Sequence, residues 1–287
     1  MSAATVISRF VDLPAAQREL RLEYDWVGCD DPNAPLLVFL HEGLGSVSMW
    51  KDFPTQLCAA VGARGLVYSR PGYGRSTPRP HDERWGLDFM HVQAQQVLPA
   101  LLDALGVQQP YWLFGHSDGG SIALIHAATF PQRVGGTIVM APHILVEEFG
   151  LKSIREARRA YVEGDLRPRL AKYHDDVDSA FWGWNRIWLD DEFPRWSIEA
   201  LLPRISAPVL AIQGHDDPYG TMAQIDGIAQ AVPRTELLKL PNCGHSPHRD
   251  QPAAVIAGTR DFLQRLLARD EATCITGVTL PVGGDLG

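Results

Sequence analysis

A serine between small residues is the first candidate for chemistry in this sequence. Residues 115–119 read Gly-His-Ser-Asp-Gly and fit the pattern Gly-x-Ser-x-Gly, in which a serine lies on a tight turn between a strand and a helix. The apolar run 111–114 precedes this turn, and the small-residue run 119–124 follows it. We therefore expect Ser117 to be presented as a nucleophile at the end of a strand.

This serine needs two partners, because its hydroxyl attacks a carbonyl only when a base takes the proton and an acid orients that base. Asp217 comes shortly after an apolar run at 208–213, and His245 follows the next apolar run at 236–240. The carboxyl ends of neighbouring parallel strands meet at one edge of a sheet, so we expect both side chains beside Ser117. Asp216 is the neighbouring alternative for the acid.

Strands and helices alternate along most of the chain, and this alternation would bring the three residues to one edge of a sheet. Apolar runs predict strands, and apolar residues at helical spacing predict helices. The predicted strands cover residues 5–11, 18–26, 35–40, 65–69, 111–115, 134–140, 208–213 and 236–240, and the predicted helices cover 50–61, 87–105, 118–129, 221–232 and 252–268. The expected fold class is α/β, with a mostly parallel central sheet flanked by helices.

The alternation stops between residues 143 and 203, where four of the eight tryptophans fall within residues 182–196. We interpret residues 143–203 as an inserted helical cap on a core formed by residues 1–142 and 204–270. The Gly-rich end, residues 271–287, lacks periodicity and is expected to be a mobile tail. The cap tryptophans either pack the cap onto the core or line an apolar pocket, and the candidates for the pocket are Trp182, Trp184 and Trp188.

Composition and motif content disfavour several classes of function. The sequence has 26 Lys and Arg against 34 Asp and Glu, and this net charge of −8 disfavours nucleic-acid binding, which needs an excess of cations. No apolar segment fits a signal peptide or a membrane span, and the four cysteines form no Cys-x-x-Cys pair. Without Walker A, Gly-x-Gly-x-x-Gly or His-Glu-x-x-His motifs, no cofactor or metal is expected. We expect a cytoplasmic protein with a small-molecule substrate and no membrane or nucleic-acid partner; its oligomeric state stays open.

Four features together resemble the α/β-hydrolase family over about residues 20 to 270. They are the loop 41–46, the loop 69–76, the Gly-x-Ser-x-Gly turn, and the sites of Asp217 and Gly244-His245. The resemblance implies an α/β-hydrolase fold in which Ser117 is the nucleophile and His245 is the general base and then acid. Asp217 would orient the imidazole, because the family's acid usually lies three residues after the glycine, here Gly214.

The resemblance also implies an oxyanion hole formed by the backbone N–H groups of Leu44 and Asp118. The family's loop usually reads His-Gly, whereas Glu42 lies between His41 and Gly43 in this chain. His41 flanks the expected site and is a further candidate for the substrate pocket.

The function implied by these residues is that of a serine hydrolase similar to carboxylesterases, which cleaves an ester of a small to medium acyl or aromatic substrate through an acyl-enzyme. The main alternative is hydrolysis of a carbon–carbon bond in a meta-cleavage product, because the chain also resembles ring-cleavage hydrolases. Thioesterase, lactonase and synthase activities stay open, as does a ligand receptor without turnover. Residues 152–172 carry seven basic and three acidic side chains, which form either a solvated helix face or a rim that attracts carboxylate-bearing substrates.

Overall fold

A computed structural model describes residues 9–13 and 19–276, with side chains up to residue 266. Eight strands form one sheet in the order β1-β2-β4-β3-β5-β6-β7-β8. The strands are β1 Arg9–Leu13, β2 Leu20–Gly28, β3 Leu36–Leu40, β4 Arg64–Tyr68, β5 Tyr111–His116, β6 Val134–Met140, β7 Val209–Gly214 and β8 Thr235–Leu240. Strand β2 runs antiparallel to β1 and β4, and the other pairs are parallel, so the predicted mostly parallel sheet is confirmed.

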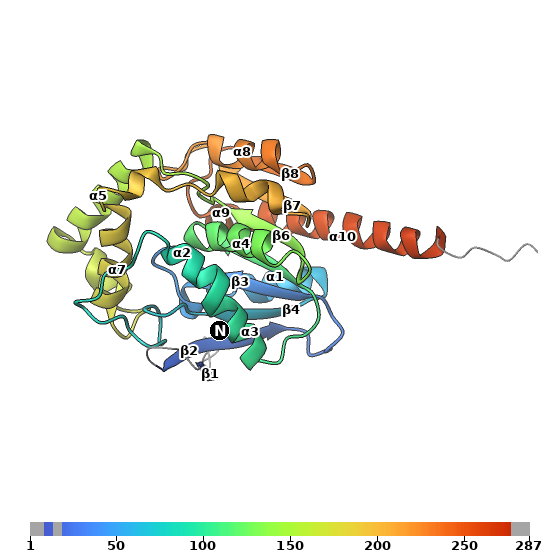
Figure 1. The fold of residues 1–287 in the computed structure, drawn as a ribbon, viewed down its shortest axis with the longest axis horizontal. Coiled ribbons are helices and arrows are strands. Elements are labelled where there is room, and N and C mark those ends of the chain that lie inside the picture. Colours follow the sequence, from blue (N-terminus) through green and yellow to red (C-terminus); the bar gives the residue numbers. More distant parts are fainter. Residues whose placement is uncertain (1–8, 14–18, 277–287) are drawn as a thin grey trace, which may run out of the picture.

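Helices cover both faces of this sheet, as Figure 1 shows. One face carries α1 Phe53–Val61 and α10 Pro252–Thr276, whose apolar side chains share a core with alternate residues of β3, β5, β6 and β7. The other face carries α3 Leu98–Ala104, α4 Asp118–Thr129 and α8 Ala223–Ala231. Strands β3 and β7 are buried at every position, which explains why β3, and β7 up to Gln213, are continuous apolar runs instead of alternating ones.

The helix predicted at 87–105 is divided into three parts. Helix α2 Phe89–Val92 is followed by a π-helical turn, Gln93–Val97, and then by α3. Pro99 lies in the first turn of α3 and has no N–H to donate to the preceding turn. We attribute the wider π turn to this missing hydrogen bond, a feature that apolar spacing alone does not reveal.

Five helical segments lie between β6 and β7, where the sequence analysis predicts an insertion at 143–203. They are α5 Glu148–Glu163, α6 Leu166–Leu170, α7 Val177–Trp188, and the 3-10 helices η3 Phe193–Arg195 and η4 Glu199–Arg204. Helices α5 and α7 lie together at one end of the molecule in Figure 1. The Asp176 side chain caps α7 by accepting a hydrogen bond of 2.8 Å from the Ser179 N–H, so this helix begins where its sequence provides a cap.

The C-terminal helix is longer than predicted. Helix α10 continues to Thr276, so residues 271–276 of the segment predicted to be a mobile tail are helical. The Ala, Arg and Glu residues at 268–272 are good helix formers, and they propagate a helix that is already nucleated by its packed first turns. The remaining residues of the predicted tail, 277–287, lie outside the described residues. No helix in the described ranges is long and apolar enough to span a bilayer.

Close packing between β3 and α4 gives a testable prediction at Gly119. A Cβ atom on Gly119 would collide with the backbone of Leu40, which cannot move without disturbing the sheet. We expect Gly119→Ala to lower the free energy of unfolding by about 3 kcal/mol, measured by urea denaturation. The matched control is Gly120→Ala, because its Cβ would meet the Pro142 side chain at 3.1 Å and alanine favours the helix. Equal losses in the two variants would contradict this explanation.

Candidate active site

The carboxyl ends of the parallel strands bring the predicted residues together. Ser117 follows β5, Asp217 follows β7, and His245 follows β8. Since β5, β6, β7 and β8 are consecutive in the sheet and parallel, their ends open on the same edge. Ser117 therefore meets His245, which lies 128 positions further along the chain.

Ser117 lies on the sharp turn between β5 and α4. Its φ of 54° and ψ of −121° belong to a region that residues other than glycine rarely adopt. The turn is held by a hydrogen bond of 2.9 Å from the Ser117 N–H to the Met140 carbonyl. Any Cβ at Gly115 would collide with the backbone of Gly119, so the small residues of the motif allow the turn to close.

A chain of hydrogen bonds connects the three predicted residues. The Nδ1 atom of His245 lies 2.8 Å from Oδ1 and 2.9 Å from Oδ2 of Asp217. The opposite ring nitrogen, Nε2, lies 2.9 Å from the Ser117 hydroxyl oxygen. Because Asp217 accepts from Nδ1–H, the neutral ring offers Nε2 as an acceptor for the serine proton. The arrangement can therefore remove a proton from Ser117 and return it.

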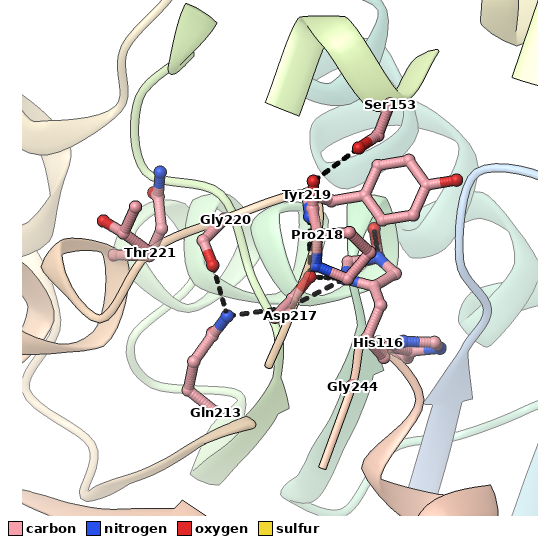
Figure 2. A network of polar contacts seen from close by, with 12 residues as sticks. His116, Ser153, Gln213, Asp217, Pro218, Tyr219, Gly220, Thr221 and Gly244 are labelled. Carbon is pink, nitrogen blue, oxygen red and sulfur yellow. Dashed lines mark hydrogen bonds and ion pairs between the residues drawn. The ribbon is translucent and has the colours of Figure 1, made fainter. Parts of the chain in front are cut away.

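Hydrogen bonds from two further groups fix the acid in place (Figure 2). Gln213 Nε2 donates to Asp217 Oδ2 at 2.7 Å, and the Tyr219 N–H donates to Oδ1 at 2.8 Å. Burial alone would raise the pKa of the Asp217 carboxyl, but His245 and the Tyr219 N–H hold that pKa below its usual value. Asp216 is exposed, so the geometry favours Asp217 as the predicted partner of His245.

Two residues near the imidazole were missed by the sequence analysis. Tyr219 lies with its ring centroid 4.6 Å from that of His245, and His143 lies 6.1 Å away. Burial, helped by the neighbouring His245, lowers the pKa of His143 to about 4, so this ring is neutral near pH 7. His143 follows the end of β6 as Asp217 follows β7, and this position in the chain was the signal available for it.

The proposed oxyanion donors both belong to segments that line the cavity above Ser117. Asp118 begins α4, where the first N–H groups of a helix have no partner within the helix and its dipole favours negative charge. In the other segment, the Glu42 carbonyl accepts 2.8 Å from Arg70 Nη2. The C=O and N–H of a trans peptide point in opposite directions, so the Gly43 N–H faces away from Arg70. This orientation makes Gly43 a second candidate beside the predicted Leu44.

His41 does not line the cavity, although it is a candidate for the substrate pocket in the sequence analysis. Its side chain has 0% exposure and is not among the residues that line the cavity. Nε2 accepts from the Arg70 N–H at 3.0 Å, and Nδ1 lies 2.7 Å from the Glu42 carbonyl. Burial and the Arg70 charge hold the pKa of His41 well below its usual value. The ring is therefore neutral and anchors the loop from beneath.

Glu42, which departs from the usual His-Gly pattern, contacts the site through His116. A carboxylate oxygen of Glu42 lies 3.5 Å from His116 Nδ1, and His116 Nε2 lies 2.6 Å from the His245 carbonyl oxygen. Burial favours a higher pKa, but the nearby His116, Arg249 and His248 hold the pKa of Glu42 well below its usual value. An ionised Glu42 thus adjoins the ring that supports the backbone of His245.

Of the three tryptophans named as candidates for the pocket, two line the cavity and one does not. Trp184 and Trp188 lie one turn apart on α7 and face inward, whereas Trp182 contacts Arg158 and Arg186 through its ring face. The helical period of 3.6 residues explains the difference, since a residue two positions earlier points to another side. Trp188 Nε1 donates to Asp118 Oδ1 at 3.2 Å, so α7 is linked directly to the turn that carries Ser117.

The cavity above Ser117 has a volume of about 410 Å³ and is lined by both the sheet edge and the 143–203 segment. Ile154, Leu170, Trp184 and Trp188 supply apolar surface, while Ser117 and His245 lie at one wall. Such a mixture of apolar walls and a few polar groups is typical of small-molecule sites. Within the described residues, no group of three His, Cys, Asp or Glu side chains is placed to hold a metal ion.

The buried Asp118 side chain predicts an unusual dependence of stability on pH. Burial raises the pKa of Asp118 to about 6, although Arg70 and the Trp188 hydrogen bond oppose that rise. The folded protein therefore binds this proton more tightly than the unfolded chain, and the ionised carboxyl destabilises the fold as pH rises through 6.

We expect Asp118→Asn to raise the free energy of unfolding at pH 7 by about 3 kcal/mol, because the amide can still accept from Trp188. The gain should fall to about 1 kcal/mol at pH 4.5, because the folded protein still holds the Asp118 proton there and only the ionisation of this carboxyl in the unfolded chain favours unfolding. Urea denaturation of both proteins at the two pH values measures this difference in the free energy of unfolding. The other titrating groups are present in both proteins, so their contributions cancel in the difference. A gain independent of pH would contradict the raised pKa.

Sequence comparisons point to one family and several activities within it. A sequence profile described as the alpha/beta hydrolase family matches residues 37–258. A 2-hydroxy-6-oxo-6-phenylhexa-2,4-dienoate hydrolase of Burkholderia cepacia is 26% identical over 254 residues, covering 79% of this chain and 87% of that protein. A 2-succinyl-6-hydroxy-2,4-cyclohexadiene-1-carboxylate synthase of Enterobacter sp. strain 638 is 30% identical over 257 residues, covering 83% and 95%.

Solved structures share the fold at lower sequence identity. A carboxylesterase of the thaumarchaeon Nitrososphaera gargenis superposes with a TM-score of 0.73 at 20% identity, covering 90% of this chain and all of that one. A thermophilic esterase from Thermogutta terrifontis gives a TM-score of 0.68 at 22% identity, covering 90% and 99%. At these identities the likeness concerns the arrangement of the sheet and helices.

Proposed function

The chain belongs to the alpha/beta hydrolase family, and from that premise we propose that it hydrolyses a carboxylic ester through an acyl-enzyme formed on Ser117. The observation that carries this proposal is the chain of hydrogen bonds from Asp217 through His245 to Ser117, at the wall of a cavity of about 410 Å³. A small to medium acyl or aromatic ester suits a cavity of this size, with its apolar surface formed partly by Trp184 and Trp188.

In the first half of the reaction, His245 Nε2 takes the proton of the Ser117 hydroxyl as its oxygen attacks the ester carbonyl. Asp217 holds the Nδ1–H tautomer and stabilises the imidazolium that forms. The tetrahedral intermediate collapses when His245 donates the proton to the leaving alcohol, and the acyl group remains on Ser117.

In the second half, a water molecule loses a proton to His245 and attacks the acyl-enzyme. The proton returns to Ser117 as the carboxylic acid leaves. In both halves the oxyanion accepts from the Asp118 N–H and from a loop N–H, either the predicted Leu44 or Gly43, whose orientation favours it. Each such donor typically lowers the barrier by about 3 to 4 kcal/mol. We propose residues 143–203 as the cap that closes this cavity.

Carbon–carbon bond hydrolysis is the second candidate, and the relatives favour it. The Burkholderia cepacia relative is named as a 2-hydroxy-6-oxo-6-phenylhexa-2,4-dienoate hydrolase, and a Comamonas testosteroni relative is named as a 2-hydroxy-6-oxononadienedioate/2-hydroxy-6-oxononatrienedioate hydrolase. That reaction needs a water molecule and a proton donor at the same position as ester hydrolysis. Thioesters and lactones would also react at such a site, while a receptor would bind a ligand without turnover.

The test is hydrolysis of p-nitrophenyl esters of increasing acyl length, beside a vinylogous 1,5-diketone acid of the meta-cleavage type. We expect saturable ester hydrolysis that disappears in Ser117→Ala, with a chain-length optimum set by the cavity. Faster cleavage of the diketone would assign the second candidate instead. If neither compound is turned over by a folded protein, the proposed function is wrong.

A further inference from the structure

Four cationic side chains surround the mouth of the cavity that contains Ser117. Lys51 follows the 3-10 helix η1 Val47–Trp50, Arg169 lies in α6, Lys172 follows α6, and Arg249 lies in the short helix α9 Pro247–Asp250. All four side chains are exposed. Because the whole chain has a net charge of −8, this grouping does not follow from composition. We call these four residues the cationic rim.

Neighbouring groups orient two of these cations without neutralising them. Lys51 Nζ donates to the Tyr173 hydroxyl at 2.8 Å and lies 4.7 Å from the centre of the ring. Arg249 Nη2 donates to the Met49 carbonyl at 3.1 Å. Both partners are neutral, so Lys51 keeps its charge available to a ligand at the opening, whereas the charge of Arg249 is shared with the nearby Glu42 carboxylate, whose pKa it helps to lower.

The carboxylates around the cavity only partly offset the cationic rim. Asp165 lies 3.6 Å from Arg169, but both side chains are more than half exposed, so this pair is weak. Two carboxyls line the cavity itself. Glu42 is paired with His116 at 3.5 Å, and Asp118 is fully buried beside Ser117. The mouth is therefore positive, while the wall around Ser117 carries the carboxyls of Glu42 and Asp118, and the buried Arg70 partly offsets the charge of Asp118.

We propose that this chain prefers esters whose acyl group ends in a carboxylate, which the cationic rim binds while the ester carbonyl lies at Ser117. This inference rests on the proposed ester hydrolysis at the same site. The rim is solvated, so the carboxylate keeps much of its water, and the attraction acts on capture of the substrate more than on the chemical step. The preference should accordingly appear in KM, with kcat little changed.

The test compares p-nitrophenyl monoesters of straight-chain dicarboxylic acids, six to ten carbons long, with their ω-amides. Each pair has nearly the same shape and differs by one negative charge. At low ionic strength we expect kcat/KM for the acid to exceed that for the amide by about tenfold at the best length. Raising NaCl to about 0.5 M should reduce this ratio several-fold, because the Debye length shortens to a few ångströms.

Charge reversal in the rim provides the decisive comparison. Arg169→Glu combined with Lys172→Glu should reduce the acid-to-amide ratio by about tenfold, while the amide ester is hydrolysed at nearly the original rate. The matched control is Lys152→Glu with Arg159→Glu on α5, which makes the same change of net charge. Both control residues are exposed, and neither lines the cavity.

The outcomes separate this inference from the proposed function. Equal rates for the acid and the amide ester, or equal effects of the two double variants, would overturn the rim proposal. Hydrolysis of the amide ester that depends on Ser117 would still support the proposed ester hydrolysis in that case. If no ester is turned over, calorimetric binding of octanedioate against octanediamide tests the rim directly. Tighter binding of the dicarboxylate, lost in the rim variant and kept in the control, would support it, and equal binding of both would overturn it.

Discussion

Replacing Ser117 with alanine is expected to lower kcat for ester hydrolysis by at least about 10⁴-fold, the largest effect predicted for this protein. The substitution removes the oxygen that forms the acyl-enzyme and leaves the His245–Asp217 pair and the proposed oxyanion donors in place. Steady-state kinetics on the best p-nitrophenyl ester measures the loss. Residual activity at the wild-type level would exclude Ser117 as the nucleophile.

A covalent probe separates loss of the nucleophile from loss of the fold. A fluorophosphonate should add one phosphonyl group to the wild-type protein at Ser117, and the mass of Ser117→Ala should stay unchanged. The variant should also unfold at no lower urea concentration, because Ser117 is held in a strained turn and contributes no buried apolar surface. Labelling of the variant at a second serine would show that the reactive residue is a different one.

Replacing Asp217 with asparagine is expected to lower kcat by about 10³- to 10⁴-fold. Three donors converge on this carboxylate, from Gln213, Tyr219 and His245. An asparagine offers one acceptor oxygen and one amide donor, so at least one of the three donors loses its partner. If that donor is the His245 Nδ1–H, the ring can take the other tautomer, and Nε2 then carries a proton and cannot accept from Ser117.

The control for this substitution is Asp216→Asn, which changes the net charge of the chain by the same amount. Asp216 is exposed and donates its backbone N–H to the Cys243 carbonyl at 2.9 Å, so its side chain is not needed for that contact. We expect its kcat/KM to change by less than about threefold, as for most surface substitutions. Equal losses at the two positions would show that the acid has been misassigned.

Local residue patterns are sufficient to predict those residues of the site that directly follow strand ends. Ser117 is predicted from a five-residue pattern between an apolar run and a run of small residues, because a strained turn tolerates only small neighbours. Asp217 and His245 are predicted from chain order and from their positions after two apolar runs. Burial on both faces makes each central strand continuously apolar, so strand ends can be recognised from the sequence alone.

Contacts between distant segments decided the rest of the site. Gln213 and Tyr219 surround Asp217 because β7 ends in a turn that folds back on its own last residues, and no pattern of residue types encodes that turn. His41 was expected at the pocket, but Arg70 binds it beneath the loop from 29 residues away. Apolar and charged residues around a turn do not reveal which side faces the substrate.

Residue patterns along the chain are enough to predict the fold class and the three residues proposed for catalysis, because both depend on short-range periodicity and on residues next to strand ends. Tertiary packing made Trp184 and Trp188 line the cavity while Trp182 lies outside it. It also decided that Lys51, Arg169, Lys172 and Arg249 share one opening. The physical reason is that the packing of the 143–203 segment against the rest of the protein sets which face of each helix points inward. This packing depends on the fit between two surfaces, and the residue pattern of one segment describes only one of them.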